Sequence, residues 1–105
     1  MRNSARYARA CVRRRDKGIC ALCGLDCTKL RKELNALPLE DRYKKAEELG
    51  IPKKRAYRKS LWDMDHTLPV AEGGGECGLD NLRTLCISCH KKETALLLKR
   101  LAEVR

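Results

Sequence analysis

The sequence predicts a small α+β fold in which a strand–loop–strand–helix unit, an N-terminal helix and an inserted helical hairpin are joined by a four-cysteine zinc knuckle site. Three observations lead to this class. The chain has 105 residues, 4% of them aromatic and none of them Phe, so its apolar core is thin and needs a cross-link. Two C-x2-C pairs, Cys20 with Cys23 and Cys86 with Cys89, offer four thiolates. Apolar residues follow helical spacing before residue 60 and then alternate as in a strand.

The length fits a single domain over residues 1–105, built of three parts. The parts are a basic N-terminal helix in 1–18, a helical insertion in 25–60 and a strand-rich core in 61–103. In the first part a helix is predicted over residues 4–16, because Ser4 suits an N-cap and Gly18 suits the C-terminal end. Its other faces are largely arginine.

The insertion is predicted to be a hairpin of two helices followed by a basic connector. Leucines recur at helical spacing up to Pro38, and a second short helix is expected over residues 39–49. Gly50 and Pro52 stop this helix, and residues 53–59 form the connector.

The core is predicted to run strand, loop, strand, helix. Residues 61–66 alternate with Trp62 on the apolar side, and a long loop with Pro69 and three consecutive glycines follows. The chain returns as a strand over 82–85 and continues as a helix over 88–103.

Charge distribution indicates the class of partner. Lys and Arg number 24 against 14 Asp and Glu, a formal charge of +10 that favours anionic partners. Residues 61–81 are an exception, with five acidic side chains and no Lys or Arg. Clustered carboxylates repel phosphate unless a cation lies between them. No secretory or membrane-spanning stretch is evident, so we expect an intracellular protein, cytoplasmic or in the nucleoid or nucleus, with no membrane partner.

The seven cysteines are better explained by metal than by disulfides, because an odd number cannot close a disulfide set. Zinc on Cys20, Cys23, Cys86 and Cys89 would tie the N-terminal helix to the core and stabilise the fold. Buried reduced cysteines or a thioredoxin-like redox pair are the alternatives. No role is assigned to Cys11, Cys27 and Cys77.

A second site is predicted around the only two histidines of the chain. Asp65 precedes His66 at the end of the first strand, Asn81 precedes the second strand, and His90 follows the last knuckle cysteine. The hairpin could bring these four side chains together. Asp65 and His90 would then offer one oxygen and one nitrogen to a divalent cation, and His66 would be available as a base. Purely structural histidines are the alternative.

Neighbouring residues have simpler interpretations. Asp63 and Asp80 are near enough to assist the second site, but they are expected to face solvent or cap a turn. Trp62 is expected in the core rather than as a platform for base stacking.

The sequence resembles the HNH endonucleases through WDMDHTLPVAEGGG, LDNLRTLC and ISCH, and through the upstream RRRDKGICALCG. Within this family, CGLD followed by a leucine-rich insertion containing LP is similar to the HNH domains of annealing helicases with a Ran-binding-type zinc finger. The resemblance implies a ββα-metal fold in which His66 is the general base that takes a proton from water. It also implies that Asp65 and His90 hold a catalytic Mg²⁺, Mn²⁺ or similar ion and that Asn81 orients His66. Some members use the residue at the Asn position as the metal ligand, which leaves the roles of Asn81 and His90 open.

DNA is the expected substrate, and basic side chains beside both sites are expected to contact its phosphates without reading sequence. They are Arg13, Arg14, Arg15, Lys53, Lys54, Arg55, Arg83 and Lys91. The sequence therefore predicts a metal-dependent HNH endonuclease that nicks or cuts DNA. Single-stranded, double-stranded, branched and RNA substrates all fit the pattern. The alternatives are a non-catalytic zinc-dependent DNA-binding module or accessory subunit and, less in keeping with the motifs, a redox-active protein.

Overall fold

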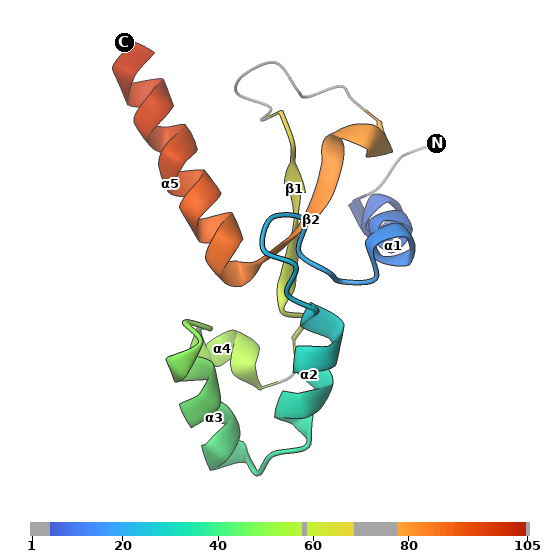
Figure 1. Cartoon of the computed structure of the whole chain (residues 1–105), viewed down its shortest axis with the longest axis vertical. Coiled ribbons are helices and arrows are strands. Elements are labelled where there is room, and N and C mark those ends of the chain that lie inside the picture. Colours follow the sequence, from blue (N-terminus) through green and yellow to red (C-terminus); the bar gives the residue numbers. More distant parts are fainter. Residues whose placement is uncertain (1–4, 58, 69–77, 105) are drawn as a thin grey trace.

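The computed structural model describes residues 5–57, 59–68 and 78–104. Its elements confirm the predicted α+β class: helices surround one two-stranded antiparallel sheet (Figure 1). The predicted N-cap Ser4, the glycine-rich loop and Cys77 lie outside the described residues.

The first helix, α1 (Ala5–Asp16), is followed by a tight reversal. Lys17 and Gly18 both adopt positive φ, 56° and 77°, which ends the helix as predicted for this position. The chain then forms a narrow loop in which Ile19 bridges to Asp26. The amide of Ala21 in this loop donates to the carbonyl of Thr84 over 2.8 Å, so the first C-x2-C pair is attached to the sheet.

The insertion contains three helices rather than the predicted hairpin and connector alone. α2 (Cys27–Asn35) begins at Asp26, whose carboxylate accepts from the Lys29 amide over 2.9 Å. α3 (Leu39–Glu48) follows Pro38. The start of the expected connector is a helical turn, α4 (Lys53–Ala56), in which the Pro52 carbonyl accepts from two amides.

The core matches its predicted order. β1 (Trp62–His66) pairs with β2 (Leu82–Cys86), so that Trp62 lies opposite Cys86 and His66 opposite Leu82. A short 3₁₀ turn, η2 (Leu79–Asn81), leads into β2. The last helix, α5 (Ile87–Val104), starts at the residue after β2 and extends away from the sheet (Figure 1).

The buried core is small and lies between α1, the insertion and the sheet. Trp62 is buried in it, as predicted, and the Arg9 guanidinium stacks 3.8 Å from the centroid of its ring. The fully buried hydroxyl of Thr84 donates to Asp16 over 3.0 Å and joins β2 to α1. The other buried residues include Val12, Cys27, Leu34, Ala46, Ile51, Ala56, Leu61 and Leu85. Over residues 5–57, 59–68 and 78–104, no helix combines the length and apolar character needed to cross a membrane.

Candidate active site

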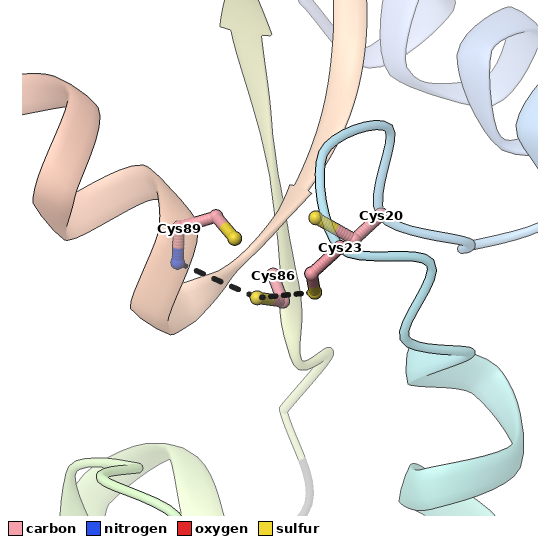
Figure 2. Close-up of side chains that lie close together, drawn as sticks. All are labelled: Cys20, Cys23, Cys86 and Cys89. Carbon is pink, nitrogen blue, oxygen red and sulfur yellow. Dashed lines mark hydrogen bonds between the residues drawn. The ribbon is translucent and has the colours of Figure 1, made fainter.

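The two C-x2-C pairs meet, although they lie far apart in the sequence (Figure 2). Cys20 and Cys23 come from the loop after α1, whereas Cys86 ends β2 and Cys89 lies in the first turn of α5. Their four sulfur atoms lie within 4.8 Å of one another, and Cys23 Sγ is 3.7 Å from Cys86 Sγ. Four cysteines converging in this way could hold a zinc ion, as the spacing predicted.

The surroundings of the sulfur atoms fit thiolate ligands. Burial raises the pKa of Cys20, but amides of Cys23, Cys86 and Leu22 outweigh it and bring the pKa to about 6. Burial and the neighbouring thiols raise the pKa of Cys89 to about 12. Four thiols this close cannot all ionise unless a cation neutralises them, which is the chemistry that a zinc ion supplies.

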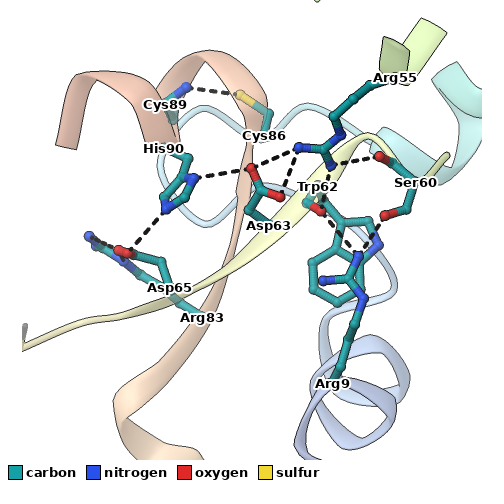
Figure 3. A network of polar contacts seen from close by, with 10 residues as sticks. All are labelled: Arg9, Arg55, Ser60, Trp62, Asp63, Asp65, Arg83, Cys86, Cys89 and His90. Carbon is teal, nitrogen blue, oxygen red and sulfur yellow. Dashed lines mark hydrogen bonds and ion pairs between the residues drawn. The ribbon is translucent and has the colours of Figure 1, made fainter. Parts of the chain in front are cut away.

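The second cluster lies where β1 faces the start of α5 (Figure 3). Side chains alternate along a strand, so Asp63 and Asp65 share the face of β1 that points to α5. His90, in the first turn of α5, lies between them: its Nδ1 is 3.1 Å from Asp63 Oδ2 and its Nε2 is 3.7 Å from Asp65 Oδ1. The structure therefore brings together Asp65 and His90, the two predicted cation ligands.

Asp63 is a member of this cluster, although the sequence analysis assigned it no role there. The expectation that it faces solvent or caps a turn is wrong, because its side chain is 24% exposed and hydrogen-bonded to both His90 and Arg55. The period of two in the strand was the available signal, since it puts residues 63 and 65 on the same face. Asp80 is exposed in η2, in agreement with its expected place.

Arg83 shares the Asp65 carboxylate with the candidate cation site. Its Nε and Nη2 donate to Asp65 Oδ2 over 3.2 and 3.1 Å, and Nη2 also lies 3.3 Å from Glu93 Oε1. This leaves Asp65 Oδ1 facing His90. The sequence predicted that Arg83 contacts DNA phosphate, whereas in the structure its guanidinium is bonded to Asp65 and Glu93 of the protein.

His66 and Asn81 lie at the open end of the sheet. His66 is the last residue of β1, on the face opposite Asp65. The Asn81 side chain accepts from the Leu68 amide over 2.8 Å and donates to the Leu68 carbonyl over 3.0 Å. The Asn81 carbonyl also accepts from the Thr67 amide over 2.7 Å. Asn81 thus holds the two residues that directly follow His66.

Some of the side chains predicted to contact phosphate are bonded to other groups of the protein. Arg15 donates to the carbonyls of Leu79 and Leu82, and Arg55 is paired with Asp63. Arg83 is bonded to Asp65, as described above. The other five residues predicted to contact phosphate are exposed: Arg13, Arg14, Lys53, Lys54 and Lys91. Lys53 lies 5.0 Å from the centroid of the Tyr43 ring.

Comparison with known proteins identifies the family. Residues 50–96 match the HNH endonuclease family. The crystal structure of the human ZRANB3 HNH domain superposes with a TM-score of 0.78 at 34% identity, covering 96% of this chain and 95% of that one. The chain belongs to the HNH endonuclease family. This confirms the resemblance read from the sequence, including the likeness to an annealing helicase.

Curated relatives of this HNH domain are much longer proteins. The mouse "DNA annealing helicase and endonuclease ZRANB3" is 35% identical over 115 residues, and the human protein of that name is 34% identical. Each match covers the whole of this chain and 11% of the relative. The HNH domain therefore spans about a ninth of the length of the curated relatives it matches.

Proposed function

We propose that this HNH domain is a divalent-metal-dependent endonuclease that hydrolyses DNA phosphodiester bonds. The observation that carries the proposal is the pair formed by Asp65 on β1 and His90 on α5, whose Oδ1 and Nε2 atoms face each other across 3.7 Å. The protein around this pair has a formal net charge of +10. The proposal agrees with the names of the relatives, which are DNA annealing helicases and endonucleases.

The donor set fits a hard divalent cation. One carboxylate oxygen and one imidazole nitrogen leave most coordination positions to water and phosphate, as Mg²⁺ prefers. Asp65 Oδ1 and His90 Nε2 lie 3.7 Å apart, so these two side chains would hold the ion together. A bound Mg²⁺ or Mn²⁺ would neutralise the charge that develops on the phosphate and the leaving oxygen.

His66 is the residue we assign as general base. An imidazole can take a proton from water as the water attacks phosphorus. Asn81 supports this role by fixing the backbone of Thr67 and Leu68, immediately after His66. These backbone contacts would hold the base in place.

The remaining residues of the proposal stabilise the fold through zinc or bind DNA. We assign Cys20, Cys23, Cys86 and Cys89 to a structural zinc ion, and Arg13, Arg14, Lys53, Lys54 and Lys91 to DNA phosphates. A reduced four-thiolate site and a DNA substrate both favour an intracellular setting.

Conversion of supercoiled plasmid to nicked or linear DNA tests the activity. We expect cleavage with Mg²⁺ or Mn²⁺, none with EDTA, and a loss of at least about 100-fold in His66→Ala, since general-base catalysis contributes that much. Thr67→Ala is the matched control. The Thr67 side chain is exposed, and the hydrogen bond from its backbone amide to the Asn81 carbonyl survives the substitution. DNA affinity, measured by gel shift, should be equal in all three proteins.

A zinc-dependent DNA-binding module without hydrolysis is the second candidate. The Arg83–Asp65 ion pair favours it, because the guanidinium already neutralises the carboxylate that a cation would need. If the wild-type protein shifts DNA but leaves the plasmid intact with every divalent ion, this candidate replaces the nuclease. Equal loss of DNA affinity and cleavage in His66→Ala would count against the general-base role.

A further inference from the structure

We propose that Asp63, held in place by Arg55 of the insertion, is a positioning residue that fixes the ring of His90 with Nε2 unprotonated and directed at Asp65. The inference rests on the proposed function, since it assigns a purpose to this tautomer in cation binding. It also gives the inserted segment a part in building the site.

The first step is the contact between His90 and Asp63. Nδ1 lies 3.1 Å from Asp63 Oδ2, within hydrogen-bonding distance, whereas Nε2 lies 3.7 Å from Asp65 Oδ1, beyond it (Figure 3). A carboxylate can only accept, so Nδ1 must carry the proton in this bond. In the neutral ring, the lone pair is then on Nε2, the atom that faces Asp65.

The second step is what holds Asp63. Arg55 Nη1 donates to both of its carboxylate oxygens, over 3.0 and 3.3 Å. Arg55 is itself fixed, because its Nη2 donates to the carbonyls of Ser60 and Trp62 over 2.7 and 3.3 Å. The guanidinium thus spans from the insertion to the first residues of β1 and keeps the Asp63 carboxylate aimed at His90.

The third step links Arg55 to the rest of the insertion. Arg31 on α2 donates to the carbonyls of Arg55 and Ala56 over 2.9 and 2.6 Å, and so holds the C-terminal end of α4. Each hydrogen bond in this series involves an ionisable side chain, and the series leads from Arg31 through Arg55 and Asp63 to His90. The path runs from α2 through α4 and β1 to α5.

The consequence concerns cation affinity. A histidine binds a metal through an unprotonated nitrogen, and a carboxylate on the other ring nitrogen selects that tautomer and orients the ring. Without Asp63, a proton on Nε2 could be shared with Asp65, which would block both candidate ligand atoms. Loss of such an outer carboxylate typically weakens metal affinity by about 10- to 100-fold.

The tautomer can be read directly by ¹⁵N–¹H correlation NMR of the two histidine rings, at about pH 8, above the ordinary imidazole pKa. The protein is used with its zinc and without added divalent ions. His66→Ala removes one ring system and so assigns the signals of His90. We expect wild-type His90 in the Nδ1–H form and Asp63→Ala with substantial Nε2–H. Asp80→Ala, another strand-adjacent carboxylate, should match the wild type.

A second measurement follows Mn²⁺ binding by titration calorimetry, with a predicted 10- to 100-fold loss for Asp63→Ala and a smaller loss for Arg55→Ala. An Nε2–H ring in the wild type, or one unchanged by Asp63→Ala, would overturn the inference. If Asp63→Ala loses its zinc, Asp63→Leu, which has a similar shape and no hydrogen-bond acceptor, replaces it. A wild-type protein with the Nδ1–H ring that binds no Mn²⁺ and cuts no DNA would instead remove the proposed function.

Discussion

Two glycines with the same backbone conformation should differ in their response to an added methyl group. Gly18 and Gly50 have φ of 77° and 75°, so an alanine at either pays the left-handed backbone cost of about 1 kcal/mol. A Cβ on Gly50 would meet nothing within 4 Å, whereas one on Gly18 would collide with Thr28 Oγ1. We predict that Gly18→Ala lowers the free energy of unfolding by roughly 2–3 kcal/mol, against about 1 kcal/mol for Gly50→Ala.

The collision itself can be isolated with a double mutant. Thr28→Ala removes Oγ1, which also donates to the Lys17 carbonyl over 3.0 Å. In the background of Thr28→Ala, the cost of Gly18→Ala should fall toward that of Gly50→Ala, and denaturant unfolding measures this coupling. Equal costs for the two glycines in the wild-type background would show that the Thr28 side chain rotates away without penalty.

At the scale of elements, one buried hydrogen bond joins α1 to the sheet. Thr84 is fully buried, and its hydroxyl donates to Asp16 Oδ2. Valine has the same shape, so Thr84→Val leaves no cavity but removes the donor. We predict a loss of about 1.5–3 kcal/mol in unfolding free energy, since hydrogen bonds to charged groups are worth that much.

The control keeps the donor and removes the methyl group. Thr84→Ser should lose about 1 kcal/mol through reduced burial alone, and in the background of Asp16→Ala the cost of Thr84→Val should nearly disappear. The pKa of Asp16 is lowered first by its hydrogen bond with Arg15 and then, against the effect of burial, by that with Thr84. A cost of Thr84→Val that is independent of Asp16 would mean that Arg15 alone satisfies the carboxylate.

The elements themselves could largely be predicted, whereas most contacts between them could not. Periodicity was enough for β1, β2 and α5, because these depend on local spacing. The four-cysteine cluster could be predicted despite its long sequence separation, because a tetrahedral zinc site needs both C-x2-C pairs. α4 was missed because residues 53–56 have no apolar period, and the turn depends on Pro52 and on Arg31 from another helix. Asp63 was misjudged for the same reason: its partners Arg55 and His90 are set by tertiary structure.

At the scale of the whole molecule, the fold is open for its length. The Cα radius of gyration is 15.2 Å, against about 13 Å for a compact chain of this size. The molecule measures 45 × 36 × 22 Å, and α5 projects from the sheet (Figure 1). A thin apolar core in such a shape buries little surface per residue, so we expect zinc bound by the cysteines that join residues 20–23 to 86–89 to supply a large share of the stability.

Removal of zinc should therefore unfold the protein rather than loosen one loop. We predict that a strong chelator, or Cys86→Ser, abolishes the cooperative thermal transition seen by circular dichroism. The reason is that zinc binding in small domains contributes on the order of 10 kcal/mol, comparable to the whole stability of a domain. Cys11→Ser is the matched control, since Cys11 is also partly buried but lies outside the cluster. It should retain one equivalent of zinc by atomic absorption and unfold cooperatively. A folded Cys86→Ser protein without metal would show instead that apolar packing suffices, and would revive the redox interpretation of the cysteines.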